Sequence, residues 1–420
     1  MTPEVKKRIE QIQQGIVPEG YVQDKDGIYP RDWASKKIGQ WLKLAERPIV
    51  LQDEEEYQLV TVRRGFGGVD SRGSFLGKNV LVKNYFIVKT GDFIISKRQI
   101  AHGACGIVPP ELYGAVVSNE YNVFLPQDGT NIQMFNLMMQ LPHYKRLFYL
   151  MSDGVHIEKL LFKTQDWMKR TLAMPLLKEQ KKIAEILSTH DKAIELQGRK
   201  IEELKRFKKG CLEKMFPRKG QKVPEKRFPG FTDDWEQRKL GEVFEEYSEK
   251  NHSELPVLTI LQGSGTIHRD ESDRNLLYDK SNLSNYKMVH EGDFIVHLRS
   301  FEGGLEIATN TGIISPAYHT FHGENTDSRF YYSYFRSKRF IDIDLKPHVY
   351  GIRDGRSIDI EGMKTIRIPF PDYEEQKAIG TYIRNLDNLI ALHQRKLEEM
   401  KKQKKALMQL LLTGIVRVKA

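Results

Sequence analysis

The sequence predicts an α+β protein: a tandem duplication of a mixed α/β domain, each copy followed by a long helix, with the two long helices pairing as an antiparallel coiled coil. Three observations support this fold class. Motifs recur in the same order in both halves of the chain, each half begins with short strand-like runs, and each half ends in a segment with an apolar heptad repeat. A length of 420 residues suits two or three domains.

The repeated motifs lie about half a chain apart. The matched pairs are Asp32-Trp33 with Asp234-Trp235, Gly91-Asp92-Phe93-Ile94 with Gly292-Asp293-Phe294-Ile295, and Glu179-Gln180-Lys181 with Glu375-Gln376-Lys377. Their offset falls along the chain from 202 to 201 to 196, as small loop deletions in a duplicated domain would produce. Chance matches would not remain in order, so we interpret the chain as a tandem duplication.

The expected elements follow the same order in both halves. Residues 1–31 form an N-terminal extension, with a short helix expected over Pro3 to Gly15. The segments that follow are a globular domain over 32–172, a long helix over 173–216, a linker over 217–231, a second globular domain over 232–367, a second long helix over 368–414 and a C-terminal tail over 415–420. Three Pro, two Gly and five basic residues between Pro217 and Gly230 are typical of a connector.

Short β-branched and aromatic runs predict strands in both globular domains, as in Phe93-Ile94-Ile95 and its counterpart Phe294-Ile295-Val296. The Gly-Asp pair before each run predicts a turn that starts the strand. We interpret Trp33 and Trp235 as core anchors. Proline residues precede each long helix, at a position where the proline ring is tolerated.

Both long segments carry apolar residues at heptad spacing, which predicts that each helix packs along another helix. The residues expected to pair the helices are Ile183, Leu187, Ile194, Ile201 and Leu204 in the first and Ile379, Ile383, Leu386, Ile390, Leu397 and Met400 in the second. Polar residues interrupt the stripe at equivalent positions, Gln197 with His393 and Lys208 with Lys404. Either these polar residues determine the register or the partner of the helix pair, or the lysine side chains extend past the contact between the helices to solvent.

The composition excludes several classes of protein. The two cysteines, Cys105 and Cys211, exclude a disulfide framework and a Cys-rich zinc site. The chain has no apolar run long enough to span a membrane and no signal-peptide core, so we expect a cytoplasmic protein. No phosphate loop, dinucleotide loop or metal-binding motif occurs, so we expect no catalytic residue, no metal site and no cofactor in this chain.

Charge and architecture together favour double-stranded DNA as the partner. Lys and Arg number 66 against 56 Asp and Glu, and the resulting net charge of +10 suits a polyanion. Two similar domains on a rod of about 60 Å would hold two reading surfaces roughly one turn of duplex DNA apart. Because the two domains differ in sequence, we expect an asymmetric, bipartite target.

The same motifs resemble those of a known family. Asp-Trp followed by Lys-Leu-Gly, the Gly-Asp-Phe-Ile block and the Glu-Gln pair that opens each long helix are similar to the recurrent marks of type I restriction-modification specificity subunits. The segment from Arg227 to Trp235 looks like the entrance to the second target-recognition domain of that family. The resemblance covers the chain from about Asp32 to Gly414, in the family's order of domain, helix, domain and helix.

The resemblance implies a non-catalytic subunit that recognises DNA sequence, with target-recognition domains at 32–172 and 232–367 that each read one half of the target. It implies that the helices set the spacer and dock two modification (methyltransferase) subunits. Restriction (endonuclease/translocase) subunits would join the full complex. S-adenosylmethionine, ATP and Mg are expected in these partners.

Sequence readout needs Arg, Lys, Asn or Gln at base edges and further cations on phosphates. The candidate DNA contacts are Arg63, Arg64, Lys97, Arg98 and Gln99 in the first domain and Arg269, Arg274, Arg299, Arg353 and Arg356 in the second. Arg98 and Arg299 occupy equivalent positions, which fits a shared role such as phosphate anchoring. The alternative for any one of them is a solvated surface arginine or a local ion pair.

Two other classes of function remain open. A methyltransferase or nuclease fused into one chain would need the cofactor and phosphate loops that the sequence lacks. A protein-binding scaffold would show the same duplication, but its binding to DNA would have no sequence preference and no salt dependence. The basic residues along the two helices either follow the DNA backbone or form a solvated face balanced by glutamates.

Overall fold

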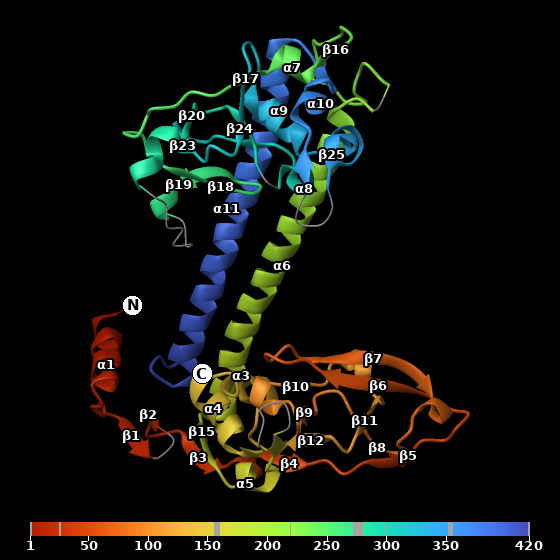
Figure 1. Cartoon of the computed structure of the whole chain (residues 1–420). Helices are drawn as coiled ribbons and strands as arrows, with labels where there is room; N and C mark the ends of the chain where they lie inside the picture. The colour runs from red at the N-terminus through yellow and green to blue at the C-terminus, as the bar shows by residue number, and fades with distance from the viewer. Residues whose placement is uncertain are drawn as a thin grey trace. The chain divides into compact units, whose positions relative to one another are not determined.

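A computed structural model describes residues 2–24, 27–154, 160–218, 220–271, 280–297, 299–351 and 356–418 (Figure 1). The chain divides into two compact units, the first made of residues 1–196 with 397–420 and the second of residues 197–396. Each unit contains one mixed α/β domain and one half of each long helix. The predicted fold class, a tandem duplication of mixed domains with two long helices, is confirmed.

The domain of the first unit is built on two sheets. A four-stranded sheet has the order β10-β9-β12-β4, and a five-stranded sheet has the order β5-β8-β11-β6-β7, in which β11 pairs with β6 in parallel. The strands are β1 Tyr21–Asp24, β2 Gly27–Pro30, β3 Ala34–Lys37, β4 Leu42–Leu44, β5 Pro48–Val50, β6 Glu56–Val62, β7 Val69–Leu76, β8 Asn84–Ile87, β9 Phe93–Ser96, β10 Cys105–Ile107, β11 Val116–Ser118, β12 Tyr121–Pro126, β13 Ser152–Asp153, β14 Leu161–Phe162 and β15 Thr171–Met174.

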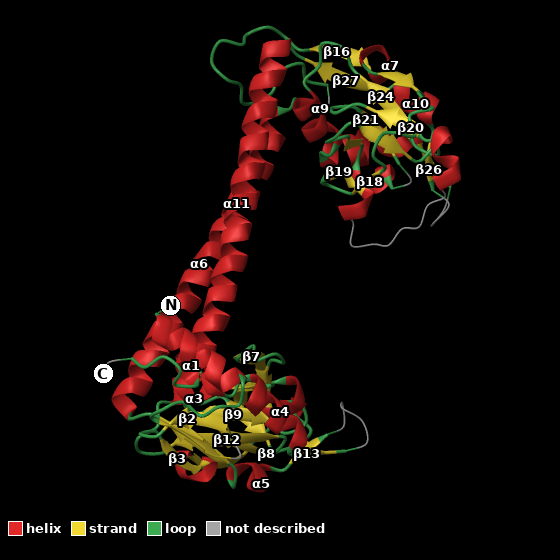
Figure 2. Cartoon of the chain, turned by 90° about the vertical axis from the view of Figure 1, so that its left-hand side faces the viewer, coloured by secondary structure: helices red, strands yellow, loops and turns green. Residues whose placement is uncertain are grey.

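The first unit also contains short helices, of which Figure 2 shows α3, α4 and α5 in red beside the yellow strands. The short helices are α1 Pro3–Gln13, α2 Ile38–Trp41, η1 Gly77–Asn79, η2 Ile100–His102, η3 Pro110–Leu112, α3 Ile132–Met138, α4 Pro142–Leu150 and α5 Thr164–Met168. The main core gathers Trp33, Phe124 and Trp167 with Ile183 of α6 and Leu411 of α11. The beginning of one long helix and the end of the other therefore complete this core.

The second unit repeats the plan with shorter strands. Its four-stranded sheet has the order β17-β24-β21-β22, and the hairpins β18-β19 and β20-β23 correspond to the larger sheet of the first unit. The strands are β16 Glu236–Lys239, β17 Glu245–Tyr247, β18 Leu258–Leu261, β19 Gly265–His268, β20 Lys287–Val289, β21 Phe294–Val296, β22 Glu306–Ile307, β23 Gly312–Ile314, β24 His319–His322, β25 Val349–Tyr350, β26 Ser357–Ile358 and β27 Arg367–Phe370.

The short helices of the second unit are α7 Leu240–Val243, η5 Arg269–Glu271, η6 Lys280–Asn285, α8 Ser300–Gly303, α9 Ser328–Phe335, the π-helix η7 Phe340–Leu345, η8 Lys346–His348 and α10 Ile360–Lys364. Its core packs Trp235 and Phe330 against Met215 at the end of α6 and Ile379 at the beginning of α11. Trp33 and Trp235 are 5% and 2% exposed, so both are core anchors as expected.

The long helices are α6 Leu177–Met215 and α11 Tyr373–Leu412. Each begins four or five residues later than the sequence predicts, at 177 instead of 173 and at 373 instead of 368. The reason is that the preceding residues form edge strands: β15 pairs with β3 in the first unit, and β27 pairs with β16 in the second. The proline after each of these strands then separates it from the helix.

Contacts between α6 and α11 within each unit run in opposite sequence directions. In the second unit, Gln197 Nε2 donates to the His393 carbonyl at 2.8 Å and Lys208 Nζ donates to Asp387 at 2.6 Å. In the first unit, Lys404 Nζ lies 2.5 Å from Asp191. The residue number rises along α6 from Gln197 to Lys208, while the number of the partner on α11 falls from 393 to 387. The two helices are therefore antiparallel.

The burial of the residues predicted to pair the helices fits helix pairing and also fits packing in the domain cores, where Ile183, Leu187, Ile379, Ile383 and Leu386 lie, so their role in pairing stays a prediction. All eleven are buried or half-buried: Ile183, Leu187, Ile201, Leu204, Ile379, Ile383, Leu386 and Ile390 are buried, and Ile194, Leu397 and Met400 are half-buried. The seam lysines do not reach past the helices to solvent. Lys208 binds Asp387 and Lys404 binds Asp191, two equivalent ion pairs that follow the repeat.

The chain termini both pack on the first unit. The expected N-terminal helix ends at Gln13, two residues early, and its Arg8 lies over the ring of Tyr21 at 5.2 Å. In the C-terminal tail, Arg417 donates to Asp32 at 2.7 and 2.8 Å and to Glu179 at 2.8 and 2.7 Å. The tail after α11 therefore closes the domain of the first unit.

Candidate nucleic-acid interface

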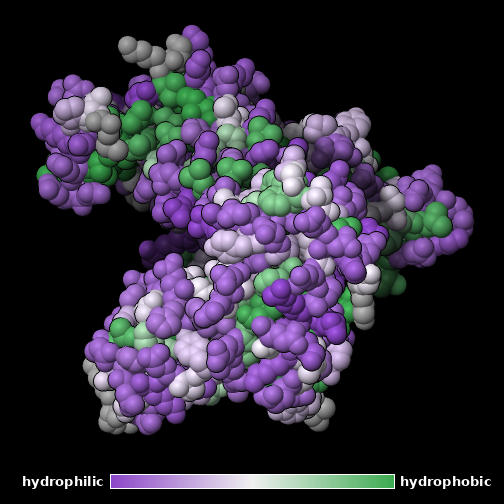
Figure 3. Space-filling model, turned by 90° about the horizontal axis from the view of Figure 1, so that it is seen from above, coloured by the Kyte–Doolittle hydropathy of each residue, from purple (hydrophilic) through white to green (hydrophobic). Residues whose placement is uncertain are grey.

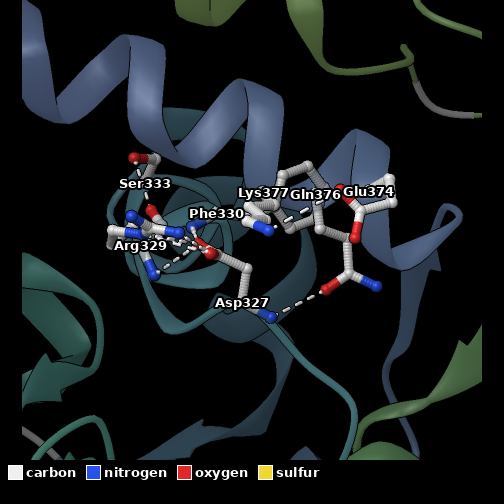
Figure 4. Close-up of polar contacts among 7 residues, drawn as sticks. All are labelled: Asp327, Arg329, Phe330, Ser333, Glu374, Gln376 and Lys377. Atoms are coloured by element: carbon white, nitrogen blue, oxygen red, sulfur yellow. Dashed lines mark hydrogen bonds and ion pairs between the residues drawn. The ribbon is translucent and has the colours of Figure 1, made fainter.

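The Glu-Gln pair that opens α11 anchors the second domain to its helix. Gln376 Oε1 accepts a hydrogen bond from the backbone N–H of Asp327 at 3.0 Å, and the Asp327 side chain caps the start of α9 (Figure 4). Glu375 is 1% exposed, and its carboxylate accepts two hydrogen bonds from Arg227 at 2.8 and 2.7 Å and one from Trp235 Nε1 at 2.8 Å. A buried carboxylate is tolerated because it is paired and hydrogen-bonded in this way.

An equivalent joint holds the first domain. Gln180 Oε1 accepts from the backbone N–H of Asn131 at 2.7 Å, and the Asn131 side chain caps α3. Glu179 accepts from Arg417, which comes from the C-terminal tail as Arg227 comes from the linker. Trp33 Nε1, the counterpart of Trp235 Nε1, is buried and makes no hydrogen bond. The same duplicated residues thus fix both domains to the long helices. The first domain lacks the hydrogen bond that the tryptophan makes to the glutamate in the second.

The structure brings together the two loops of the first domain that the sequence singled out. The tip of the β6–β7 hairpin is held to the loop after β9, because Gly65 N–H donates to the His102 carbonyl at 2.7 Å and Phe66 N–H donates to the Gly103 carbonyl at 2.8 Å. Phe66 takes a left-handed backbone (φ 60°), and its ring lies against Gly103, where an added Cβ would meet it at 2.9 Å. Arg63 and the Lys97–Gln99 segment therefore share one corner of the domain.

The arginines at this corner stay exposed even where a carboxylate pairs with them. Arg63 forms an ion pair with Asp70 and is 67% exposed, and Arg98 Nε donates to Glu120 at 2.6 Å with its side chain 53% exposed. Arg64 is exposed and Lys97 is half-buried. Gln99 is half-buried, and its Oε1 atom is buried and accepts no hydrogen bond, so this oxygen is not exposed at the corner; a DNA contact of Gln99 stays a prediction.

Two of the candidates in the second domain lie at the same short helix, α8. Arg299 is exposed and caps the start of α8, while Arg356 lies over the ring of Phe301 at 4.4 Å and 3.4 Å from Glu302. Arg269 is half-buried and donates from Nε to Thr259 across the β18–β19 hairpin at 3.2 Å. Arg274 and Arg353 lie outside the described residues.

His297 positions the backbone of Arg299. Its Nδ1 accepts from the Arg299 N–H at 3.3 Å, and its backbone N–H donates to Ser300 Oγ at 2.9 Å. Burial, assisted by the nearby charges of Arg336 and Arg299, lowers the pKa of His297 to about 4. The ring is therefore neutral near pH 7, which lets Nδ1 act as the acceptor.

Arg72 is a candidate that the sequence reasoning missed. It is exposed on β7, next to a β-bulge between Leu59 and Val60, and its charge acts on Tyr121. The sequence around it, Val69 to Leu76, does not alternate between apolar and polar residues and so offered no signal for this position. The bulge, which the sequence does not reveal, decides which face of the sheet it joins.

The face of the molecule in Figure 3 is mostly polar, as a surface that binds a polar ligand would be. Figure 3 shows a face covered mostly by hydrophilic side chains, with hydrophobic groups in smaller patches. Within the part of the chain that the structure describes, no group of three His, Cys, Asp or Glu side chains is placed to hold a metal ion. No helix among the same residues is long and apolar enough to cross a bilayer.

Comparisons with known proteins point in one direction. Residues 30–206 and 232–402 match the family model described as "Type I restriction modification DNA specificity domain". The chain is 26% identical over 423 residues to the type I restriction enzyme MjaVIII specificity subunit of Methanocaldococcus jannaschii, covering 93% of this chain and 94% of that protein.

Two solved structures have the same fold. One is the type I restriction-modification system S subunit from M. genitalium, with 12% identity, a TM-score of 0.52 and coverage of 90% of this chain and 96% of that one. The other comes from a study of complex assembly and conformational transition of the type I R-M system, with 15% identity, a TM-score of 0.54 and coverage of 92% and 99%.

Proposed function

The chain belongs to the family of type I restriction-modification DNA specificity proteins, and from this premise we propose that its two domains each read one half of an asymmetric, bipartite DNA target. As a specificity subunit, the chain recognises DNA sequence and is not catalytic, and catalysis resides in other subunits. The first domain, 32–172, reads one half-site and the second, 232–367, reads the other.

One comparison between the two domains carries this proposal: both have an exposed arginine at the equivalent position, and the residues around it differ. Arg98 and Arg299 follow the equivalent strands β9 and β21 and are both exposed, as a shared phosphate anchor requires. The exposed residues at the tips of the equivalent hairpins differ: Arg64 lies between β6 and β7 in one domain, and Ser264 lies between β18 and β19 in the other. Equal anchors with unequal surroundings support two related readers of two different half-sites.

A domain exchange tests this proposal. Residues 32–172 are replaced by the corresponding domain of a related specificity protein, and the target is mapped from the methylated motifs that the assembled complex produces. We expect one half of the target to change while the other half and the spacer persist. A change in both halves, or in neither, would refute the assignment of one half-site to each domain.

We further propose that the two long helices set the spacer between the half-sites. α6 has 39 residues and α11 has 40, which corresponds to about 60 Å of helix. Adding one heptad to each helix, between Gln197 and Lys208 in α6 and between Asp387 and His393 in α11, keeps the seam in register. We expect the spacer to lengthen by about three base pairs, since a heptad adds about 10 Å. An unchanged spacer would refute this role.

Two modification (methyltransferase) subunits would dock on the chain, and restriction (endonuclease/translocase) subunits would complete the assembly. S-adenosylmethionine, ATP and Mg would act in those partners. Such a complex works on the DNA of the cell, so we place it in the cytoplasm. Titration of the purified chain with modification subunit, followed by native mass spectrometry, tests the count: two bound copies are expected, and saturation at one would refute it.

A further inference from the structure

A buried carboxylate supports the hairpin that joins β18 and β19 in the second unit. Glu306 of β22 is fully buried. Its two oxygens accept hydrogen bonds from the backbone N–H groups of Gly263 at 2.6 Å and Gly265 at 3.2 Å, at the turn of this hairpin. Tyr332 Oη donates to the same carboxylate at 3.0 Å, and Arg336 forms an ion pair with it. The carboxylate is therefore fully paired, and it holds the hairpin turn against the rest of the domain.

The first domain holds its equivalent hairpin without a carboxylate. Glu306 pairs with Ile295 across β21 and β22. Gly106 pairs with Ile94, the counterpart of Ile295, across β9 and β10, and it is therefore the counterpart of Glu306. A Cβ added to Gly106 would lie 3.0 Å from Gly68 Cα, so the hairpin backbone itself fills this space. The two hairpins are thus positioned by different chemical groups at the same place in the repeat.

The tip of the second hairpin carries a side chain that is suited to reading a base. Gln262 is exposed, and its amide makes no hydrogen bond among the residues that the structure describes. The amide lies against the end of α8, because a Cβ added to Gly303 would collide with Gln262 Nε2. The helix α8 begins directly after Arg299, which is exposed. Gln262 and the candidate phosphate anchor Arg299 therefore lie at one corner of the domain.

The first domain has the same arrangement. There the tip of the β6–β7 hairpin contacts the loop after β9, where Gly65 N–H donates to the His102 carbonyl at 2.7 Å. In each domain the hairpin tip thus touches the segment that follows the strand of the Gly-Asp-Phe-Ile motif. A shared placement with different side chains is what two readers of different half-sites require.

The chemistry of a glutamine amide favours a base over a phosphate. The amide presents a donor and an acceptor side by side, which matches N7 and N6 of adenine in the major groove. A phosphate offers acceptors only, so it would leave the amide oxygen without a partner. Because bidentate pairing depends on direction, the backbone that carries the amide must be held in place. The hydrogen bond from Gly263, the residue after Gln262, to Glu306 holds it.

We infer that Gln262 reads an adenine in the half-site of the second domain, and that Glu306 is a positioning residue that acts through Gln262. The inference rests on the proposed function, in which this domain reads one half of a bipartite target. It adds which residue contacts a base, which base that is, and which buried group holds the reader in place.

Three variants of the full chain, each assembled with the modification subunit, test the inference. Gln262→Ala removes the reader. Glu306→Gln keeps the size of the side chain and one acceptor oxygen but loses the other. Gly303→Ala leaves the hairpin and its carboxylate unchanged and displaces the Gln262 amide. Glu246→Gln is the matched control, because Glu246 is a half-buried carboxylate on β17, at the opposite edge of the same sheet, where it pairs with Lys364 at 2.7 Å.

The measurement is discrimination between bases. The target is first mapped from the motifs that the wild-type complex methylates, and circular dichroism with thermal melting verifies that each variant folds. Affinity is then measured by fluorescence anisotropy for the target duplex and for duplexes in which one base pair at a time is replaced.

We expect Gln262→Ala to lower discrimination at one A·T pair of the second half-site about tenfold, the contribution of a good bidentate contact. Gly303→Ala and Glu306→Gln should lower discrimination at the same pair by less. Adding Glu306→Gln to Gln262→Ala should have no further effect at this pair, because one residue acts through the other. Discrimination in the first half-site, and at every position in Glu246→Gln, should stay within about twofold of wild type.

Unchanged discrimination at every pair in Gln262→Ala would overturn the inference, and a loss at a G·C pair would overturn the assignment of adenine. Equal weakening on all duplexes with a smaller salt slope would identify Gln262 as a phosphate contact and overturn base reading. An additive double variant would overturn the positioning role of Glu306. Glu306→Asp, which keeps the charge beside Arg336 but shortens the reach to the turn, replaces Glu306→Gln if that variant does not fold. A wild-type complex without a bipartite target would refute the proposed function itself.

Discussion

Replacing Glu375 by alanine is the sharpest test of how the second domain is fixed to its helix. The substitution removes the acceptor for two Arg227 donors at 2.8 and 2.7 Å and for Trp235 Nε1 at 2.8 Å. Arg227 is 14% exposed, so its charge is left largely desolvated, and Trp235 keeps a buried N–H without an acceptor. Breaking a buried pair from one side costs about 3–5 kcal/mol, and we expect a loss of unfolding free energy in this range.

Two matched variants provide reference values for the loss of unfolding free energy. Glu374→Ala removes the neighbouring carboxylate, which is 67% exposed and 3.7 Å from Lys377, and we expect a change below about 0.5 kcal/mol. Glu179→Ala removes the equivalent residue of the first unit, where Arg417 is 36% exposed, and we expect an intermediate loss of about 1–2 kcal/mol because solvent replaces part of the pairing.

The assay is urea unfolding followed by tryptophan fluorescence and far-UV circular dichroism, with the free energy extrapolated to water. The expected order of destabilisation is Glu375→Ala, then Glu179→Ala, then Glu374→Ala. A Glu375→Ala variant within about 1 kcal/mol of wild type would refute the claim that this carboxylate holds the domain to α11.

Three further predictions concern the DNA-reading surface. Arg98→Ala and Arg299→Ala should each weaken DNA binding and reduce the slope of log affinity against log salt by about 1, as fluorescence anisotropy would measure, and an unchanged slope would exclude phosphate contact. Gly103→Ala should lower the unfolding free energy of the first unit by about 1–2 kcal/mol in urea, because the φ of Gly103 is +75° and an added Cβ would meet Phe66 at 2.9 Å. The half-site read by the second domain should not change. A shift in that half-site would contradict the reasoning. His297 has a pKa lowered to about 4 by burial against 6.5 when unfolded, so the unfolded chain takes the proton first and stability should fall as the pH drops from 6.5 towards 4. We expect His297→Asn to remove about 2 kcal/mol of that fall, allowing for partial solvation of the ring, and a variant with the wild-type pH dependence would contradict the assignment.

The burial of the heptad residues could be predicted residue by residue because its cause is local. An apolar residue every 3.5 positions selects one face of a helix whatever surrounds it, and all eleven residues assigned to that face are buried or half-buried. The helix starts were misplaced for the opposite reason. Whether 171–174 and 367–370 are helix or strand depends on the distant edge strands β3 and β16 that pair with them.

Some features of the candidate DNA contacts could likewise be predicted from the sequence, and others could not. Residue type and spacing singled out Arg63 and Arg98, which the structure brings to one corner of the first domain. Neither type nor spacing could reveal that Gln99 Oε1 is buried or that Arg72 is exposed beside a bulge, since the first depends on tertiary packing and the second on the register of the β6–β7 hairpin. The contact roles of all these residues stay predictions.

The amino-acid sequence by itself determined that this chain is a duplication with two mixed domains and two long pairing helices, because repeats and heptads are properties of order along the chain. The tertiary structure alone decided which partner each polar residue takes: Lys208 with Asp387, Arg417 with Glu179, and Arg227 with Glu375. Such pairs join residues up to 238 positions apart, and only the packed fold brings their charges within reach.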